Sequence, residues 1–220
     1  PAPSMSDRPS TANEAITRPV LAGLRDAAQN NAKDATEKLY KAVYDSRFAL
    51  LPEDLRYKAL FTLGALAMQD NDRQAEAHGL LVRATAFVQA DGEAWLDRTA
   101  TAYAIDDYVD SARSVTTIAR HWPDVLRTIA DQPIYIIDTN LAAGATQSVT
   151  RQAMLQALFD ARWRDRDGEP SFLWRELTGL LLAQGKTAQA VTVASRIASA
   201  RVVLSMRVDK RFDAVTQREP

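Results

Sequence analysis

Residues 74–87, QAEAHGLLVRATAF, and residues 109–122, VDSARSVTTIARHW, decide the fold of this chain. In both stretches two alanines stand seven residues apart, and the second stretch follows the first at an interval of 35 residues. The alanines are Ala77 with Ala84 and Ala112 with Ala119. Each pair falls on the apolar stripe of an amphipathic helix, because apolar residues recur at steps of three and four. A two-helix unit repeated at this period predicts a helical solenoid, in which stacked units bury one another's apolar faces.

The same two-helix pattern extends along most of the chain. The clearest units lie at about 51–90, 91–123 and 170–200, and a degenerate unit fits at about 131–165. Residues 134–137 form a β-branched run, for which we expect a short helix because no second strand candidate is available to pair with it. Residues 1–11 are rich in proline and serine and predict a flexible lead-in. The rest, 12–220, is expected to be a single helical-repeat domain that contains no sheet.

Composition excludes several kinds of site. The net charge is −1 with 25% charged residues, so no overall field attracts nucleic acid or an anionic membrane. The chain has no cysteine, which excludes disulfides, thiolate catalysis and cysteine-ligated metals. No apolar run approaches the length, about 18 residues, that a membrane span needs. These absences leave a folded chain with ordinary surface charge, and we expect no nucleic-acid partner.

Motifs that carry chemistry are also absent. The two histidines, His78 and His121, lie on second helices of neighbouring units, and their spacing indicates no carboxylate that converges with both. The acidic residues of 106–110 are interpreted as turn and helix-start residues, and the four tryptophans as packing residues. No phosphate-binding glycine loop, nucleophile elbow or zinc-protease motif occurs. We therefore expect no catalytic activity, no cofactor and no metal.

The repeated units resemble tetratricopeptide repeats. The residues that carry the resemblance are bulky first-helix positions followed by small residues at helix crossings: Leu63, Gly64, Ala77 and Ala84; Trp95, Ala100, Tyr103, Ala112, Ala119 and Pro123; Trp174, Leu177, Gly179 and Ala190. The resemblance covers about residues 51–200. It implies a right-handed α-α superhelix of stacked antiparallel helix pairs.

The resemblance further implies a non-catalytic scaffold that binds a peptide or protein segment in a concave groove. In that family the first helix of each pair lines the groove. Carried over to this chain, the lining residues are Lys58, Phe61, Met68, Asp97, Thr101, Phe172 and Arg175. Such a mixed apolar groove with isolated charges suits an extended or helical partner segment.

An alternative is that the chain is the helical scaffold of a larger exported assembly or enzyme, with the chemistry elsewhere. Apolar spacing continues through residues 206–215, which predicts an uncapped end that is open to self-association. The chain begins with Pro1 and has no initiator methionine. A cleaved signal peptide explains such a start, and Met5 as the natural start or a trimmed chain are the alternatives. We favour, by a small margin, a bacterial periplasmic or secreted protein over a cytoplasmic one.

Overall fold

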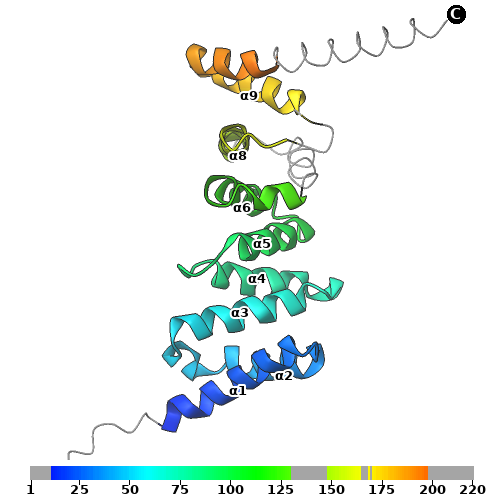
Figure 1. The fold of residues 1–220 in the computed structure, drawn as a ribbon, viewed down its shortest axis with the longest axis vertical. Helices are drawn as coiled ribbons and strands as arrows, with labels where there is room; N and C mark the ends of the chain where they lie inside the picture. The colour runs from blue at the N-terminus through cyan, green and yellow to red at the C-terminus, as the bar shows by residue number, and fades with distance from the viewer. Residues whose placement is uncertain (1–10, 130–147, 165–167, 169, 198–220) are drawn as a thin grey trace, which may run out of the picture. The chain divides into compact units, whose positions relative to one another are not determined.

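The computed structural model describes residues 11–129, 148–164, 168 and 170–197, and within these ranges every element longer than one residue is a helix. The all-α prediction is therefore confirmed for the described residues. The α-helices are α1 (Thr11–Ala28), α2 (Ala32–Val43), α3 (Glu53–Ala67), α4 (Gln74–Ala84), α5 (Gly92–Ala104), α6 (Tyr108–His121), α8 (Ser148–Asp160) and α9 (Ser171–Ala183), with a further helix over 187–197 (Figure 1). Short 3-10 helices are η1 (Ser46–Leu50), η2 (Asn71–Arg73) and η3 (Val125–Ile129).

The chain divides into two compact units, Pro1–Ser114 and Val115–Pro220. In the first unit α1 packs on α2, α2 on α3, α3 on α4 and α4 on α5. In the second unit α8 packs on α9. Consecutive helices therefore pack in pairs, as the repeat pattern predicts. The single domain over residues 12–220 and the right-handed superhelix stay predictions.

Three helix pairs are joined by turns of identical length and geometry. Residues 29–31, 105–107 and 184–186 connect α1 to α2, α5 to α6, and α9 to the helix over 187–197. In each turn the middle residue has a positive φ: 59° at Asn30, 62° at Asp106 and 72° at Gly185. The backbone N–H groups of the second and third turn residues donate back into the last turn of the helix, for example Gly185 to Leu182 and Lys186 to Leu181, both at 2.9 Å. Asparagine, aspartate and glycine tolerate this left-handed conformation best. Their positions in the sequence therefore determine where the first helix of each of these pairs ends.

Close approach between paired helices depends on glycine and alanine. A Cβ atom at Gly64 would lie 2.9 Å from Cγ of Leu81, and one at Gly23 would lie 2.8 Å from Cγ of Leu39. The repeat alanines Ala77, Ala84, Ala112, Ala119 and Ala190 are all buried, as predicted. Gly179 differs, because a Cβ atom there would meet nothing within 4 Å. The interpretation of Gly179 as a crossing residue is therefore wrong, since it lies on the outer side of α9.

Each unit has its own core. In the first unit apolar side chains of α1, α2, η1, α3, α4 and the start of α5 form one cluster, with Leu39, Leu60, Leu63 and Leu80 at its centre. In the second unit Trp174 is fully buried, and its ring meets Phe159 edge to face at 5.3 Å. The guanidinium of Arg196 lies 5.2 Å from the Trp174 ring centre. Trp163 and Trp174 are both buried, so these two tryptophans are packing residues, as predicted.

Several predictions fall outside the described residues. These are the lead-in over residues 1–10, the short helix at 134–137 and the apolar spacing of 206–215. Residue 11, which the sequence places in the lead-in, begins α1. Only the second half of the degenerate unit at 131–165 is described, and it holds α8.

The two glycines Gly64 and Gly79 provide a direct test of the α3–α4 crossing. Gly64→Ala should overpack the contact with buried Leu81, whereas Gly79→Ala adds a methyl group to open space and gains helix propensity. We expect the free energy of unfolding of Gly64→Ala to lie below that of Gly79→Ala by about 1–3 kcal/mol. Urea unfolding followed by circular dichroism measures the difference. Equal stability of the two variants would mean that α3 and α4 do not meet at Gly64.

Candidate protein-binding face

The candidate face is formed in the first unit by Tyr57, Lys58 and Phe61 of α3 together with Asp97 of α5; we call it the α3–α5 face. The rings of Tyr57 and Phe61, one turn apart, are stacked with an interplanar angle of 5° and centroids 5.9 Å apart. Tyr57 is buried, Phe61 is half-buried and Lys58 is exposed. This arrangement offers an aromatic edge beside an exposed ammonium group.

Asp97 supplies the acidic side of the α3–α5 face. Its carboxylate is half-buried, and within the described residues no hydrogen bond or ion pair engages it. Burial, and after it the nearby carboxylates of Glu93 and Asp91, raise the pKa of Asp97 to about 6. The pKa of Tyr57 is also raised, by burial first and then by Asp91. The middle of α5 therefore carries a partly desolvated acidic group that has no counter-ion among the described residues.

Met68 and Thr101, which the sequence also places in the groove, contribute differently. Met68 is the half-buried residue that caps the end of α3, and its carbonyl accepts a hydrogen bond of 2.7 Å from the Gln74 amide. Thr101 is completely buried, and its hydroxyl donates to the Asp97 carbonyl at 3.0 Å. A buried side chain lines no open groove, so Thr101 is a packing residue in this structure. The outward side of α5 runs instead through Glu93, Asp97, Ala100 and Ala104.

Phe172 and Arg175 lie on α9 in the second unit, and both are exposed. Phe172 stands in the first turn of α9 with 46% of its surface accessible. Of the predicted groove residues, the structure thus brings Lys58, Phe61 and Asp97 to the surface of one unit. Phe172 and Arg175 form a separate exposed set on the other.

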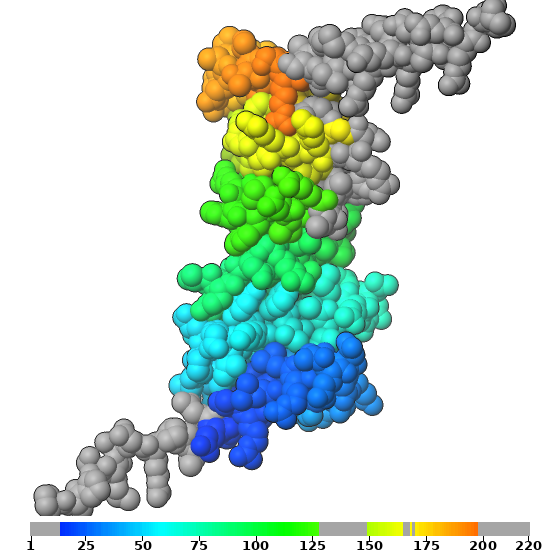
Figure 2. All heavy atoms as spheres, in the orientation of Figure 1, coloured from blue at the N-terminus to red at the C-terminus, as the bar shows by residue number. Residues whose placement is uncertain are grey.

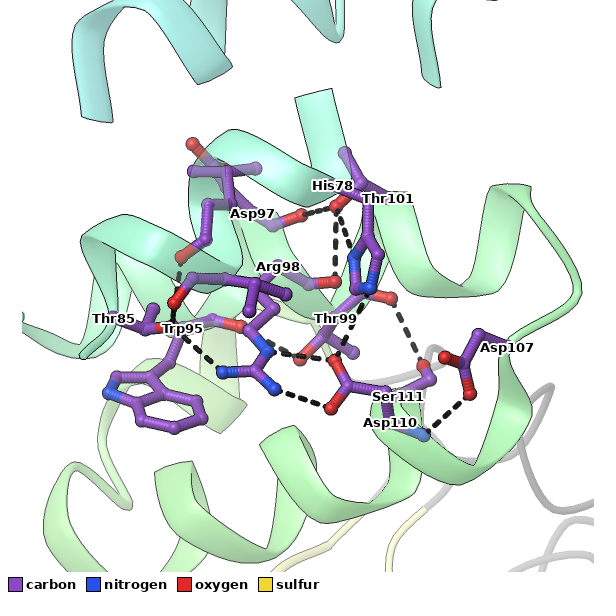
Figure 3. Close-up of polar contacts among 12 residues, drawn as sticks. His78, Thr85, Trp95, Asp97, Arg98, Thr99, Thr101, Asp107, Asp110 and Ser111 are labelled. Atoms are coloured by element: carbon purple, nitrogen blue, oxygen red, sulfur yellow. Dashed lines mark hydrogen bonds and ion pairs between the residues drawn. The ribbon is translucent and has the colours of Figure 1, made fainter. Parts of the chain in front are cut away.

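A polar cluster that the sequence patterns did not indicate joins α4, α5 and α6 (Figure 3). Arg98 of α5 forms a two-pronged ion pair with Asp110 of α6, in which Nε donates to Oδ2 at 2.7 Å and Nη2 to Oδ1 at 2.5 Å. Its remaining nitrogen, Nη1, donates to the Thr85 hydroxyl at 2.8 Å. The guanidinium also lies over the Trp95 ring, 5.0 Å from the ring centre. Arg98 therefore joins the end of α4, the middle of α5 and the start of α6.

His78 completes this cluster without forming a strong hydrogen bond. Its Nε2 lies 3.7 Å from Oδ2 of Asp110, and its Nδ1 lies 3.5 Å from the Thr101 hydroxyl. The Thr101 hydroxyl, the His78 ring and the Asp110 carboxylate follow one another in space as the groups of a catalytic triad do, but their geometry differs from that of a triad. The Thr101 hydroxyl is inaccessible and already donates to the backbone, and the carboxylate of Asp110 is held by Arg98. The cluster is built to hold helices together.

The acidic residues of 106–110 divide between two roles. Asp107 accepts a hydrogen bond of 3.0 Å from the backbone N–H of Asp110 and so caps α6, as expected for a helix-start residue. Asp106 occupies the turn. The interpretation of Asp110 as a helix-start residue is incomplete, because its carboxylate is the acceptor of the Arg98 ion pair and its side chain is only 14% exposed.

Hollows described on the first unit lie away from this cluster. They have volumes of about 570, 670 and 360 Å³, are shallow and are lined by residues of α1, α2, the end of η2 and the start of α4. None of the three includes Asp97, His78 or Asp110. Within the described ranges no group of three or more acidic or histidine residues is placed to hold a metal ion. No described helix is both long enough and apolar enough to cross a membrane.

Comparison with known proteins finds no matching family model, no matching curated protein and no matching solved structure.

The Arg98–Asp110 pair should dominate the stability of this region. Asp110→Asn leaves a guanidinium that is only 16% exposed without its counter-charge, and we expect a loss of about 3 kcal/mol in the free energy of unfolding. Asp124→Asn is the matched control, because it breaks an exposed pair with Arg127 and should leave the melting temperature unchanged. The double variant Arg98→Met with Asp110→Leu should recover much of the loss. If Asp110→Asn melts with the parent, the pair is not part of the folded state.

Asp97 predicts a specific pH dependence of stability. Its pKa in the folded chain, about 6, lies above the ordinary value of 3.8, so the folded state binds the proton more tightly than the unfolded chain. The contribution of this group to the free energy of unfolding therefore falls as pH rises from 3.8 to about 6. Asp97→Asn should remove this fall in the free energy of unfolding between pH 3.8 and about 6. Above about pH 6 the variant should be more stable than the parent. Urea unfolding of both proteins on either side of the window tests this, and parallel pH profiles would contradict it.

Proposed function

We propose that this chain is a non-catalytic scaffold that binds a segment of another protein on the α3–α5 face. The segment presents an apolar side chain to Phe61 and a lysine or arginine to Asp97. The observation that carries the proposal is the half-buried carboxylate of Asp97, which has no partner among the described residues and lies within electrostatic range of Tyr57, one member of a stacked aromatic pair.

The energetic argument concerns Asp97. A charge that is partly removed from water without a counter-ion destabilises the fold, and its raised pKa reflects this cost. A lysine or arginine of a bound segment supplies the missing charge, so part of the cost is recovered on binding. Charge-assisted hydrogen bonds of this kind are about twice as strong as neutral ones.

Phe61 supplies the apolar part of the contact. Its ring is already held by Tyr57 and by the core beneath, so binding against it costs little side-chain entropy. Aromatic side chains that are rigid in the free protein are common among the residues that dominate binding. The tetratricopeptide resemblance agrees with this location, because that family binds partner segments along the first helix of each pair.

A second function is favoured by the second unit. Leu182 and Val191 of α9 and the following helix are 53% and 63% exposed, and Phe172 is also exposed. Apolar side chains in such number suit a chain that is the scaffold of a larger exported assembly, where neighbouring parts cover them. The α3–α5 face would serve the same role in either case.

Site-specific capture tests the proposal. Because the chain has no cysteine, Lys58→Cys carries a single benzophenone label on the α3–α5 face, and Gly79→Cys carries it on the exposed side of α4 as the matched control. Light should link a partner to the label at position 58 and not to the label at position 79. The captured segment is then identified and synthesised as a peptide.

The peptide gives the quantitative result. We expect Phe61→Ala and Asp97→Asn each to weaken its binding on the order of tenfold, while circular dichroism stays helical. Replacing the lysine or arginine of the peptide should weaken its binding to the parent by a similar factor, and should change its binding to Asp97→Asn little. Equal capture at both labelled positions, or peptide binding that neither substitution alters, would place the interface elsewhere.

A further inference from the structure

The outer side of α1 carries a row of four exposed residues, with Pro19 inside the helix near its centre. Glu14, Arg18, Leu21 and Arg25 recur at steps of four, three and four, so they lie on one face of the helix. Leu21, near the middle of the row, is 46% exposed. Within the described part of the chain the three charged side chains form no ion pair. This α1 row is therefore an apolar centre flanked by unpaired charges.

The opposite side of α1 is firmly packed. Ile16 and Val20 are buried, and Gly23 brings the backbone against Leu39 of α2. Asp26 accepts a charge-assisted hydrogen bond of 2.5 Å from Lys38 Nζ, which joins α1 to α2 a second time. The space-filling view shows α1 and α2 packed together next to α3 (Figure 2). The orientation of the α1 row is thus fixed by packing.

Shallow hollows flank the α1 row. One, of about 570 Å³, lies beside Ala15, Pro19 and Ala22 and reaches Lys38 of α2. The other, of about 360 Å³, lies beside Thr17, Leu21 and Arg25. Small residues on one side and a central leucine on the other form a ridge next to a depression. A second helix with the same surface fits such a shape, with its ridge in the facing depression.

The order of charges along the α1 row is self-complementary. Glu14 and Arg25 stand at equal distances from the point between Pro19 and Val20, about 16 Å apart along the axis. If a second α1 lies antiparallel across the row with a two-fold axis at that point, each Glu14 faces Arg25 of the other copy. Each Arg18 then faces Leu21 of the other copy, where its methylene chain covers the leucine and its guanidinium extends to water.

We propose that this face binds a second copy of the chain, with two α1 helices packed antiparallel in a symmetric dimer. The occupant follows from the charges, because a copy of the same row supplies counter-charges to Glu14 and Arg25 at once, while the guanidinium of Arg18 stays in water. A contact between single helices is small, so the dimer is weak and depends on protein concentration. Dimerisation is independent of the proposed function, since it uses a different face and its readout is oligomeric state.

Charge exchange tests both the interface and its direction. Sedimentation velocity of the full chain over a range of concentrations should show a monomer–dimer equilibrium. Glu14→Arg places two arginines opposite each other, and Arg25→Glu places two glutamates opposite each other, so each variant alone should be monomeric. Mixed together, the two variants should form a heterodimer, because both contacts between positions 14 and 25 then join an arginine of one variant to a glutamate of the other.

Two further variants complete the test. Leu21→Glu should remove dimerisation, whereas Val88→Glu, at a position 96% exposed outside α1, should retain it. Circular dichroism identifies any variant that fails to fold, and the double variant Glu14→Arg with Arg25→Glu should dimerise like the parent. A parent that stays monomeric at all concentrations, a dimer that both single substitutions leave intact, or a mixture that does not pair would each overturn the proposal.

Discussion

The backbone of Gly64 lies against the side chain of Leu81, and this close approach sets how α3 packs on α4. A helix pair that lies this close buries one stripe of each helix and leaves the other faces for neighbours. In the first unit those neighbours are α2 on one side and α5 on the other, and the core cluster is continuous across them. Any side chain larger than glycine at residue 64 must move Leu81, which is itself fully buried. The position of the surface residues of α3 therefore depends on this contact.

The polar cluster extends the same constraint from α4 to α6. Arg98 cannot leave Asp110 without leaving two partly buried charges uncompensated, and its third hydrogen bond holds Thr85 at the end of α4. With α5 fixed in this way, Thr101 is completely buried, and Asp97 is half-buried within electrostatic range of Tyr57. The carboxylate of Asp97, which has no partner among the described residues, thus lies next in sequence to Arg98, which holds the carboxylate of Asp110. The contacts of Arg98 that fix α5 therefore also determine the position of Asp97 in the proposed binding surface.

Local signals in the sequence are sufficient for much of the fold. The alanine spacing predicts the buried stripes, and Asn30, Asp106 and Gly185 end their helices through the same left-handed turn. Other features depend on contacts that a single stretch does not encode. Gly64 and Gly179 look equivalent in sequence, yet only Gly64 faces a neighbouring helix. The repeat resemblance places Thr101 outward, and threonine itself suits either side of a helix. The Arg98–Asp110 pair joins residues of different helices, so no local pattern predicts it.

If a lysine or arginine of a bound segment pairs with the Asp97 carboxylate, binding must change the pKa of that carboxyl. The most direct measurement is the pKa of the Asp97 carboxyl, followed by carbon-13 NMR with and without the captured peptide. We predict a pKa of about 6 in the free chain and a marked fall in the complex. By linkage, peptide affinity should weaken as pH falls below that value, because the carboxyl must then lose a proton to pair. An Asp97 pKa that is unchanged by the bound peptide would contradict the claim.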